Sequence, residues 1–265
     1  MGGFDLNILS LLSFVLAGVV FAYAAYTSTD NPMAFVDFHG ALIVFGGSVA
    51  ATAISFQLDR ILLMLKVFWT RTLRGKKPDY VKIIKSLMIL AEAYRKGEDM
   101  ESLVNQQTDP FIQEAMQVLL DGVIEEKEIP RVLKKRVLTT YSRYNADAAR
   151  FVSMGKYPPA MGLLGAVMGM IALLGGLGKP GAEKGVGPAM SIALVATLYG
   201  IALANLVIIP IGENLSETSS EIKTKNLMIV EGVKLIAAKT NPIVLAEELN
   251  SFLLPGERID WKNLN

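Results

Sequence analysis

Small residues recur at helical spacing in two long apolar stretches of the chain's second half. The first stretch carries Gly162, Gly165, Gly169, Ala172 and Gly176, and the second carries Ala189, Ala193, Ala196, Gly200 and Ala204. Thr197 places one hydroxyl beside the second row. Spacings of three and four put side chains on one helix face, where small residues let two helices approach closely in lipid. A narrow pore also needs small walls, so the rows predict close packing, a pore lining, or both.

Titratable groups are missing from these same stretches. Residues 158–178 and 185–212 contain no Asp, Glu, His, Lys or Arg, although proton carriers inside membranes generally use such groups. If this chain conducts protons, another polypeptide must supply the titrating group. The sequence therefore predicts an obligate complex.

Enzyme, metal and nucleic-acid functions find little support in the sequence. The chain has no cysteine, a single histidine and a net charge of +1, so neither a metal site nor a nucleic-acid surface is indicated. Residues 175–180 read Gly-Gly-Leu-Gly-Lys-Pro, but a phosphate-binding loop needs Gly and Ser or Thr where this chain has Leu173 and Pro180. We predict no enzymatic activity, catalytic residue, cofactor or metal.

The composition indicates a membrane protein. Of the residues, 52% are hydrophobic and 19% charged, and the mean hydropathy is +0.40. Four stretches without charge (7–27, 40–57, 158–178 and 185–212) are long enough to span a bilayer. Basic residues cluster after the second: Arg60, Lys66, Arg71, Arg74, Lys76 and Lys77. The positive-inside rule makes this segment cytoplasmic, which places both termini in the cytoplasm; no cleavable leader is apparent.

Between the spans, the spacing of apolar residues is helical throughout. A helix is expected up to Gly97, another over 110–120 after Asp109, and a long one over 130–152. Residues 59–69 predict either a helix along the membrane surface or the inward continuation of the second span. We therefore predict an all-α membrane protein with four transmembrane helices and a large helical cytoplasmic domain. Its parts are a first hairpin (1–57), a cytoplasmic domain (58–157), a channel-forming hairpin (158–212) and C-terminal cytoplasmic helices (213–265).

Two prolines frame the second hairpin at its cytoplasmic side. Pro159 opens the third span and Pro210 closes the fourth. Because proline removes a backbone donor and can kink or end a helix, each either marks a helix end or forms a hinge that couples the membrane to the cytoplasmic domain.

Several motifs resemble those of the flagellar stator family MotA/PomA. Residues 157–171 (Tyr-Pro-Pro-Ala-Met-Gly-Leu-Leu-Gly-Ala-Val-Met-Gly-Met-Ile) and 187–200 (Gly-Pro-Ala-Met-Ser-Ile-Ala-Leu-Val-Ala-Thr-Leu-Tyr-Gly) are similar to its third and fourth spans. Residues 91–97 (Ala-Glu-Ala-Tyr-Arg-Lys-Gly), Asn241-Pro and 252–258 (Phe-Leu-Leu-Pro-Gly-Glu-Arg) are similar to its cytoplasmic motif and tail. The resemblance covers nearly the whole chain.

This resemblance implies a pentamer in the inner membrane around two copies of a single-span, MotB-like B subunit. That subunit supplies a membrane aspartate and anchors to peptidoglycan. Ion flow then drives rotation, and the cytoplasmic domain pushes on a rotor protein of the flagellar switch. Thr197 would line the ion path opposite that aspartate, and Pro159 and Pro210 would be the coupling prolines.

The rotor contact departs from the family pattern. By resemblance Arg95 faces the rotor, but the acids that usually follow eight to eleven positions later come early here. The candidate surface comprises Arg95, Lys96, Glu98, Asp99 and Glu101; a solvated surface without a partner is the alternative.

Two alanines bear on whether the chain conducts protons or sodium ions. Sodium-type relatives tend to have threonine where this chain has Ala166 and Ala196 in the ion path. Without those oxygen ligands we predict that the chain conducts protons, and a sodium-type stator is the alternative.

An ExbB/TolQ-type energiser of outer-membrane processes shares the channel hairpin but typically has one span before the cytoplasmic block, whereas two are predicted here. A scaffold without ion flow would use the small residues for packing alone.

Overall fold

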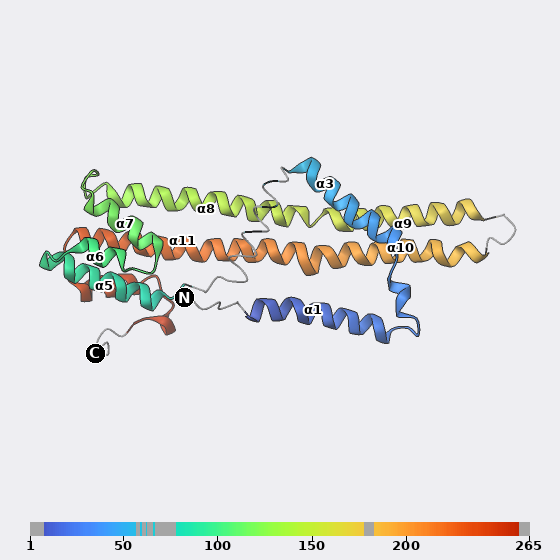
Figure 1. The fold of residues 1–265 in the computed structure, drawn as a ribbon, viewed down its shortest axis with the longest axis horizontal. Coiled ribbons are helices and arrows are strands. Elements are labelled where there is room, and N and C mark those ends of the chain that lie inside the picture. Colours follow the sequence, from blue (N-terminus) through green and yellow to red (C-terminus); the bar gives the residue numbers. More distant parts are fainter. Residues whose placement is uncertain are drawn as a thin grey trace. The chain divides into compact units, whose positions relative to one another are not determined.

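The computed structural model describes residues 8–56, 59, 62, 66, 78–177 and 183–259. Within this part the regular structure is entirely helical and contains no strand, which confirms the predicted all-α class (Figure 1). The chain forms two compact units: Met1–Lys76 with Asn145–Thr218, and Lys77–Tyr144 with Ser219–Asn265. Two long helices, α8 (Ile129–Met154) and α11 (Ile209–Ala237), contribute residues to both units.

The first unit contains most of the apolar helices. In chain order they are α1 (Ile8–Thr27), the 3₁₀ turn η1 (Pro32–Phe35), α2 (Phe38–Ala41), the π-helical segment η2 (Leu42–Gly46), α3 (Gly47–Ser55), α9 (Tyr157–Gly176), α10 (Glu183–Leu203) and the π-helical segment η4 (Ala204–Ile208). α9 and α10 lie side by side along most of their length, and η2 and α3 pack on α9 (Figure 1).

Three helical stretches in the described residues are long and apolar enough to cross a membrane: Pro32–Ser55, Ile129–Gly176 and Lys184–Ala237. They contain the whole of the fourth predicted span and nearly all of the second and third. The first predicted span is a 20-residue helix, α1, whose part Val15–Thr27 is a shorter apolar helix. The count of four spans therefore stays a prediction.

The second unit is a packed helical domain. It contains α5 (Tyr80–Lys96), α6 (Met100–Asn105), α7 (Pro110–Leu120), α12 (Pro242–Asn250) and the short turn η5 (Pro255–Glu257), together with the outer parts of α8 and α11. Its core is made by fully buried apolar side chains from all the longer helices, including Ile84, Leu87, Leu90, Ile112, Met116, Leu133, Met228, Ile229, Leu245 and Leu249.

Local signals set several helix ends as predicted. Gly97 ends α5 in the left-handed conformation, with φ of 73°, which glycine adopts without steric cost. The Asp109 carboxylate caps α7, whose bounds match the expected 110–120. The long charged helix is slightly longer than predicted, and α6 was not foreseen because its pattern covers fewer than two turns. The expected surface helix at 59–69 lies almost wholly outside the described residues.

One expectation about Pro210 is wrong. The alternative that this proline marks a helix end does not hold, because it lies in the first turn of α11, which continues to Ala237. The hinge alternative stays a prediction. The π-helical segment η4 immediately precedes α11. Because an interior proline cannot donate to the preceding turn, a local change of helical pitch at this point accommodates it.

Candidate functional site

The contact between α9 and α10 is made by the predicted small residues. A Cβ atom on Gly162 would lie 2.9 Å from the Ala196 carbonyl oxygen, and one on Gly165 would lie 2.6 Å from the Ala196 Cβ. Gly169 is equally close to the backbone of Ala189. The packing interpretation of these rows is therefore correct here. It does not extend to Gly176, around which a Cβ would meet no atom within 4 Å.

Thr197 lies half-buried at the centre of this contact. Its hydroxyl is 3.0 Å from the Ala193 carbonyl oxygen and 3.5 Å from that of Gly162. The hydroxyl proton is therefore held by the helix backbone, while the oxygen keeps lone pairs that can accept a hydrogen bond. The Thr197 oxygen can therefore accept a hydrogen bond from a donor in the ion path, such as a water molecule or a protonated carboxyl group.

The two alanines predicted in the ion path differ in their surroundings. Ala196 is a residue of α10 and is fully buried between α9 and α2, whereas Ala166 is half-buried. A side chain at position 196 therefore acts first on helix packing. Between Gly185 and Leu203, α10 offers no carboxylate or basic side chain, and neither does α9.

Both candidate coupling prolines lie where α8, α9 and α11 meet. A Cβ on Gly200 would be 2.4 Å from the Pro158 carbonyl oxygen and 3.1 Å from the Pro159 Cα. Nearby, Gly155 contacts Ile209, the residue before Pro210. The prolines thus lie at one end of the hairpin, next to contacts that leave no room for a larger residue.

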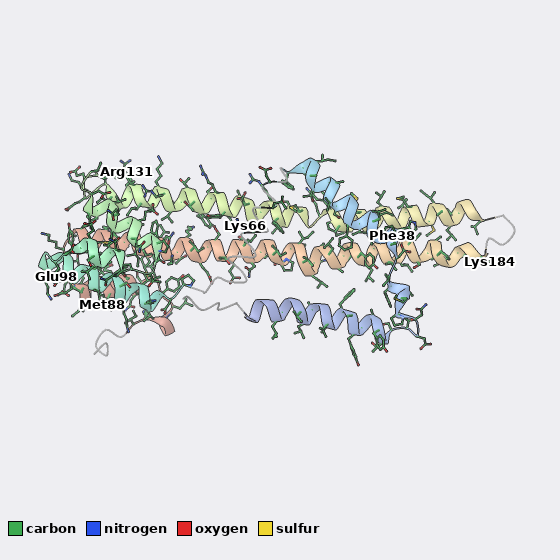
Figure 2. The ribbon with its side chains drawn as sticks, in the orientation of Figure 1. Phe38, Lys66, Met88, Glu98, Arg131 and Lys184 are labelled. Carbon is green, nitrogen blue, oxygen red and sulfur yellow. The ribbon has the colours of Figure 1, made fainter. Side chains whose placement is uncertain are left out.

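The charged surface is exposed and only loosely paired. Lys96 and Arg95 lie 3.2 and 3.8 Å from the Glu92 carboxylate, and all three side chains are about half exposed. Asp99 also has a structural role, because its carboxylate accepts a hydrogen bond from the Glu101 N–H and caps α6. Glu98 follows the end of α5 and is exposed (Figure 2).

Sequence reasoning missed one polar contact beside Thr197. The Tyr199 hydroxyl binds the backbone of the segment between η1 and α2. No sequence signal distinguishes this tyrosine from an aromatic residue facing lipid. In the part of the chain that the structure describes, no cluster of three or more His, Cys, Asp or Glu side chains could hold a metal ion.

Comparisons with known proteins identify the family. The MotA/TolQ/ExbB proton channel family matches residues 103–227. Chemotaxis protein PomA of Vibrio alginolyticus is 30% identical over 251 residues, which are 94% of this chain and 97% of that protein. The chain belongs to the MotA/TolQ/ExbB proton channel family. Motility protein A of Borreliella burgdorferi is 31% identical over 260 residues and covers 96% of both chains.

Solved structures agree with this family assignment. A chain in the structure of C. jejuni MotAB is matched with a TM-score of 0.83 and 25% identity, over 96% of this chain and 99% of that one. The flagellar MotAB stator complex from Bacillus subtilis gives the same TM-score at 24% identity and supports the fold. These relatives support the role of a flagellar stator A subunit, in a family of proton channels rather than of enzymes.

Proposed function

We propose that this chain is the ion-conducting A subunit of a bacterial flagellar stator and turns proton flow into torque on the rotor. The observation that carries this is its resemblance over nearly the full length to motility proteins A. A resemblance limited to the channel hairpin would suit an ExbB/TolQ-type energiser equally well.

Proton conduction requires a partner. The channel helices α9 and α10 offer the Thr197 hydroxyl but no carboxylate between Gly185 and Leu203 or along α9. A MotB-like single-span subunit brings the membrane aspartate, and a pentamer of this chain surrounds it. The large exposed apolar side chains of α9, such as Leu163 and Ile171, face lipid or neighbouring helices in that assembly.

The charge distribution along the chain supports the orientation. The segment after the second span is rich in Lys and Arg, whereas the turn before it has none. By the positive-inside rule both termini lie in the cytoplasm. A stator subunit with this orientation resides in the inner membrane. The second unit, with Arg95, Lys96, Glu98, Asp99 and Glu101, then faces the rotor.

A deletion in the native host tests this function. Cells that lack the gene but keep normal filaments should fail to swim, and the intact gene on a plasmid should restore swimming. Swimming that persists in sodium-free medium at fixed proton-motive force supports protons over sodium. A deletion strain that swims normally but has impaired outer-membrane transport would favour the energiser instead.

A further inference from the structure

Two backbone groups, one at the end of η1 and one just before α2, form hydrogen bonds with one side chain of α10. The Tyr199 hydroxyl donates a hydrogen bond to the Phe35 carbonyl oxygen at 2.7 Å and accepts one from the Asp37 N–H at 3.2 Å. An irregular segment next to a membrane helix needs such partners, because unpaired backbone groups are costly in an apolar environment. The Tyr199 hydroxyl thus holds residues 35–37 against α10 through two hydrogen bonds.

A second contact holds α2 on the same part of α10. Gly40 is buried, and a Cβ there would lie 3.3 Å from the Ala196 nitrogen. The backbones of α2 and α10 therefore touch, one turn along the helix from Tyr199 (Figure 2 labels Phe38 at the start of α2). The ring of Phe45 also packs against the Tyr199 ring, with centroids 6.4 Å apart.

These contacts enclose two residues of the candidate ion path, Ala196 and Thr197. Ala196 has α2 on one side and Gly165 of α9 on the other, and Gly162 lies against the Thr197 Cα. On one side, close packing against α9 holds this part of α10. On the other side, α2 is held against it by the Gly40 contact and by the hydrogen bonds of the Tyr199 hydroxyl.

We propose that Tyr199 is a positioning residue for ion conduction, whose hydroxyl locks the segment between η1 and α2 onto α10 and so sets the surroundings of Thr197. This inference rests on the proposed function and adds a residue to its machinery. Tyr199 need not touch the ion; it acts through the placement of α2.

The test substitution is Tyr199→Phe, which keeps the ring contact and removes both hydrogen bonds. Tyr26→Phe is the matched control, because Tyr26 is exposed near the same turn and its hydroxyl makes no hydrogen bond within the part of the chain that the structure describes. Both variants are made in the full chain with its B subunit. Proton flux is measured in liposomes per assembled complex, as a function of external pH, so that lower assembly alone does not change the result.

A distance measurement reports on positioning directly. The chain has no cysteine, so spin labels attached through Met33→Cys and Leu194→Cys, both at exposed positions, report on the turn and on α10 alone. Tyr199→Phe should lower flux per complex about fivefold, the order expected when buried groups lose their hydrogen-bond partner, and should broaden the distance distribution. Tyr26→Phe should do neither.

Gly40→Ala supplies an independent variant if Tyr199→Phe assembles poorly. It retains the hydroxyl, but its new Cβ lies 3.3 Å from the Ala196 nitrogen, so α2 and α10 must separate by a few tenths of an ångström. It should therefore lower flux in the same direction. Unchanged flux in Tyr199→Phe would overturn the inference, and so would lost flux with an unchanged distance distribution, which would mean direct action on the ion. Absence of flux in the unaltered complex would overturn the proposed function itself, and with it the positioning role of Tyr199 in ion conduction.

Discussion

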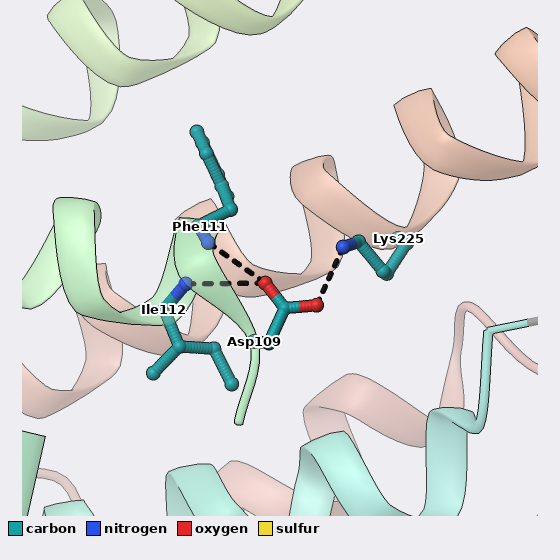
Figure 3. A network of polar contacts seen from close by, with 4 residues as sticks. All are labelled: Asp109, Phe111, Ile112 and Lys225. Carbon is teal, nitrogen blue, oxygen red and sulfur yellow. Dashed lines mark hydrogen bonds and ion pairs between the residues drawn. The ribbon is translucent and has the colours of Figure 1, made fainter. Parts of the chain in front are cut away.

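The Lys225 ammonium nitrogen lies 2.5 Å from the Asp109 carboxylate oxygen Oδ2, and both side chains are more than four-fifths buried (Figure 3). The other oxygen of the same carboxylate, Oδ1, accepts hydrogen bonds from the N–H groups of Phe111 and Ile112. One carboxylate therefore caps α7 and also ties it to α11. α11 follows the channel helix α10 along the chain with only η4 between them.

Breaking this ion pair should destabilise the second unit. Lys225→Met leaves a largely buried carboxylate without its cation, and we expect a loss of about 2 kcal/mol in the free energy of unfolding. Arg136→Met is the control, because the Arg136–Glu114 pair is nearly half exposed and such pairs contribute less than about 1 kcal/mol. Chemical denaturation of the detergent-solubilised protein measures both. Equal effects would contradict the importance assigned to burial.

Close packing at Gly200 makes a clear prediction for the hairpin. In Gly200→Ala the new methyl group collides with the Pro158 carbonyl, and overpacking of this kind costs about 1–3 kcal/mol. Gly175→Ala meets no atom within 4 Å and should be tolerated. Thermal unfolding in detergent, with the amount of protein in the membrane, distinguishes the two variants. A Gly200→Ala protein as stable as the parent would show that α9 and α10 can separate freely here.

The hydroxyl of Thr197 can be tested without changing side-chain volume. Thr197→Val keeps the shape and removes the oxygen, whereas Thr197→Ser keeps the oxygen. If this oxygen accepts a hydrogen bond in the ion path, proton flux per complex should fall about tenfold in the valine variant and stay near the parent value in the serine variant. Similar flux in all three proteins would remove Thr197 from the ion path.

Asp99 combines a structural and a candidate functional role, which two substitutions separate. Asp99→Ala removes the α6 cap and should cost about 1 kcal/mol of stability. Asp99→Asn keeps a capping oxygen but removes the charge, so the unfolding free energy should barely change. If the charge contacts the rotor, swimming speed should fall in the asparagine variant as well. Glu98→Gln, which alters a charge without a capping role, is the comparison.

We expect the free energy of unfolding to depend on pH in the alkaline range through Tyr94. Burial, together with the charge of Glu126, raises the pKa of its phenol above 10. The unfolded chain therefore loses this proton at lower pH than the folded chain does, and the contribution to stability present below pH 10 falls as the pH rises above it. Tyr94→Phe should flatten this decline in denaturation curves measured at increasing pH. An unchanged pH dependence would contradict the assignment.

The sequence by itself determined the class of this protein. Long apolar stretches without charge indicate membrane helices because unpaired charge in lipid is so unfavourable, and the glycine and alanine rows predicted which helix faces meet. Asp109 and Gly97 set helix ends through interactions within a few residues. The motifs around Thr197 were enough for the family.

Only the tertiary structure decided how distant segments meet. The Tyr199 hydroxyl bonds a backbone more than 160 residues away, and Lys225 pairs with a carboxylate 116 residues away; neither pairing leaves a periodic signal. The burial of Ala196 likewise depends on α2, α9 and α10 together. Helix periodicity reports the environment along one helix, whereas these contacts depend on which helices become neighbours, and packing of the whole chain decides that.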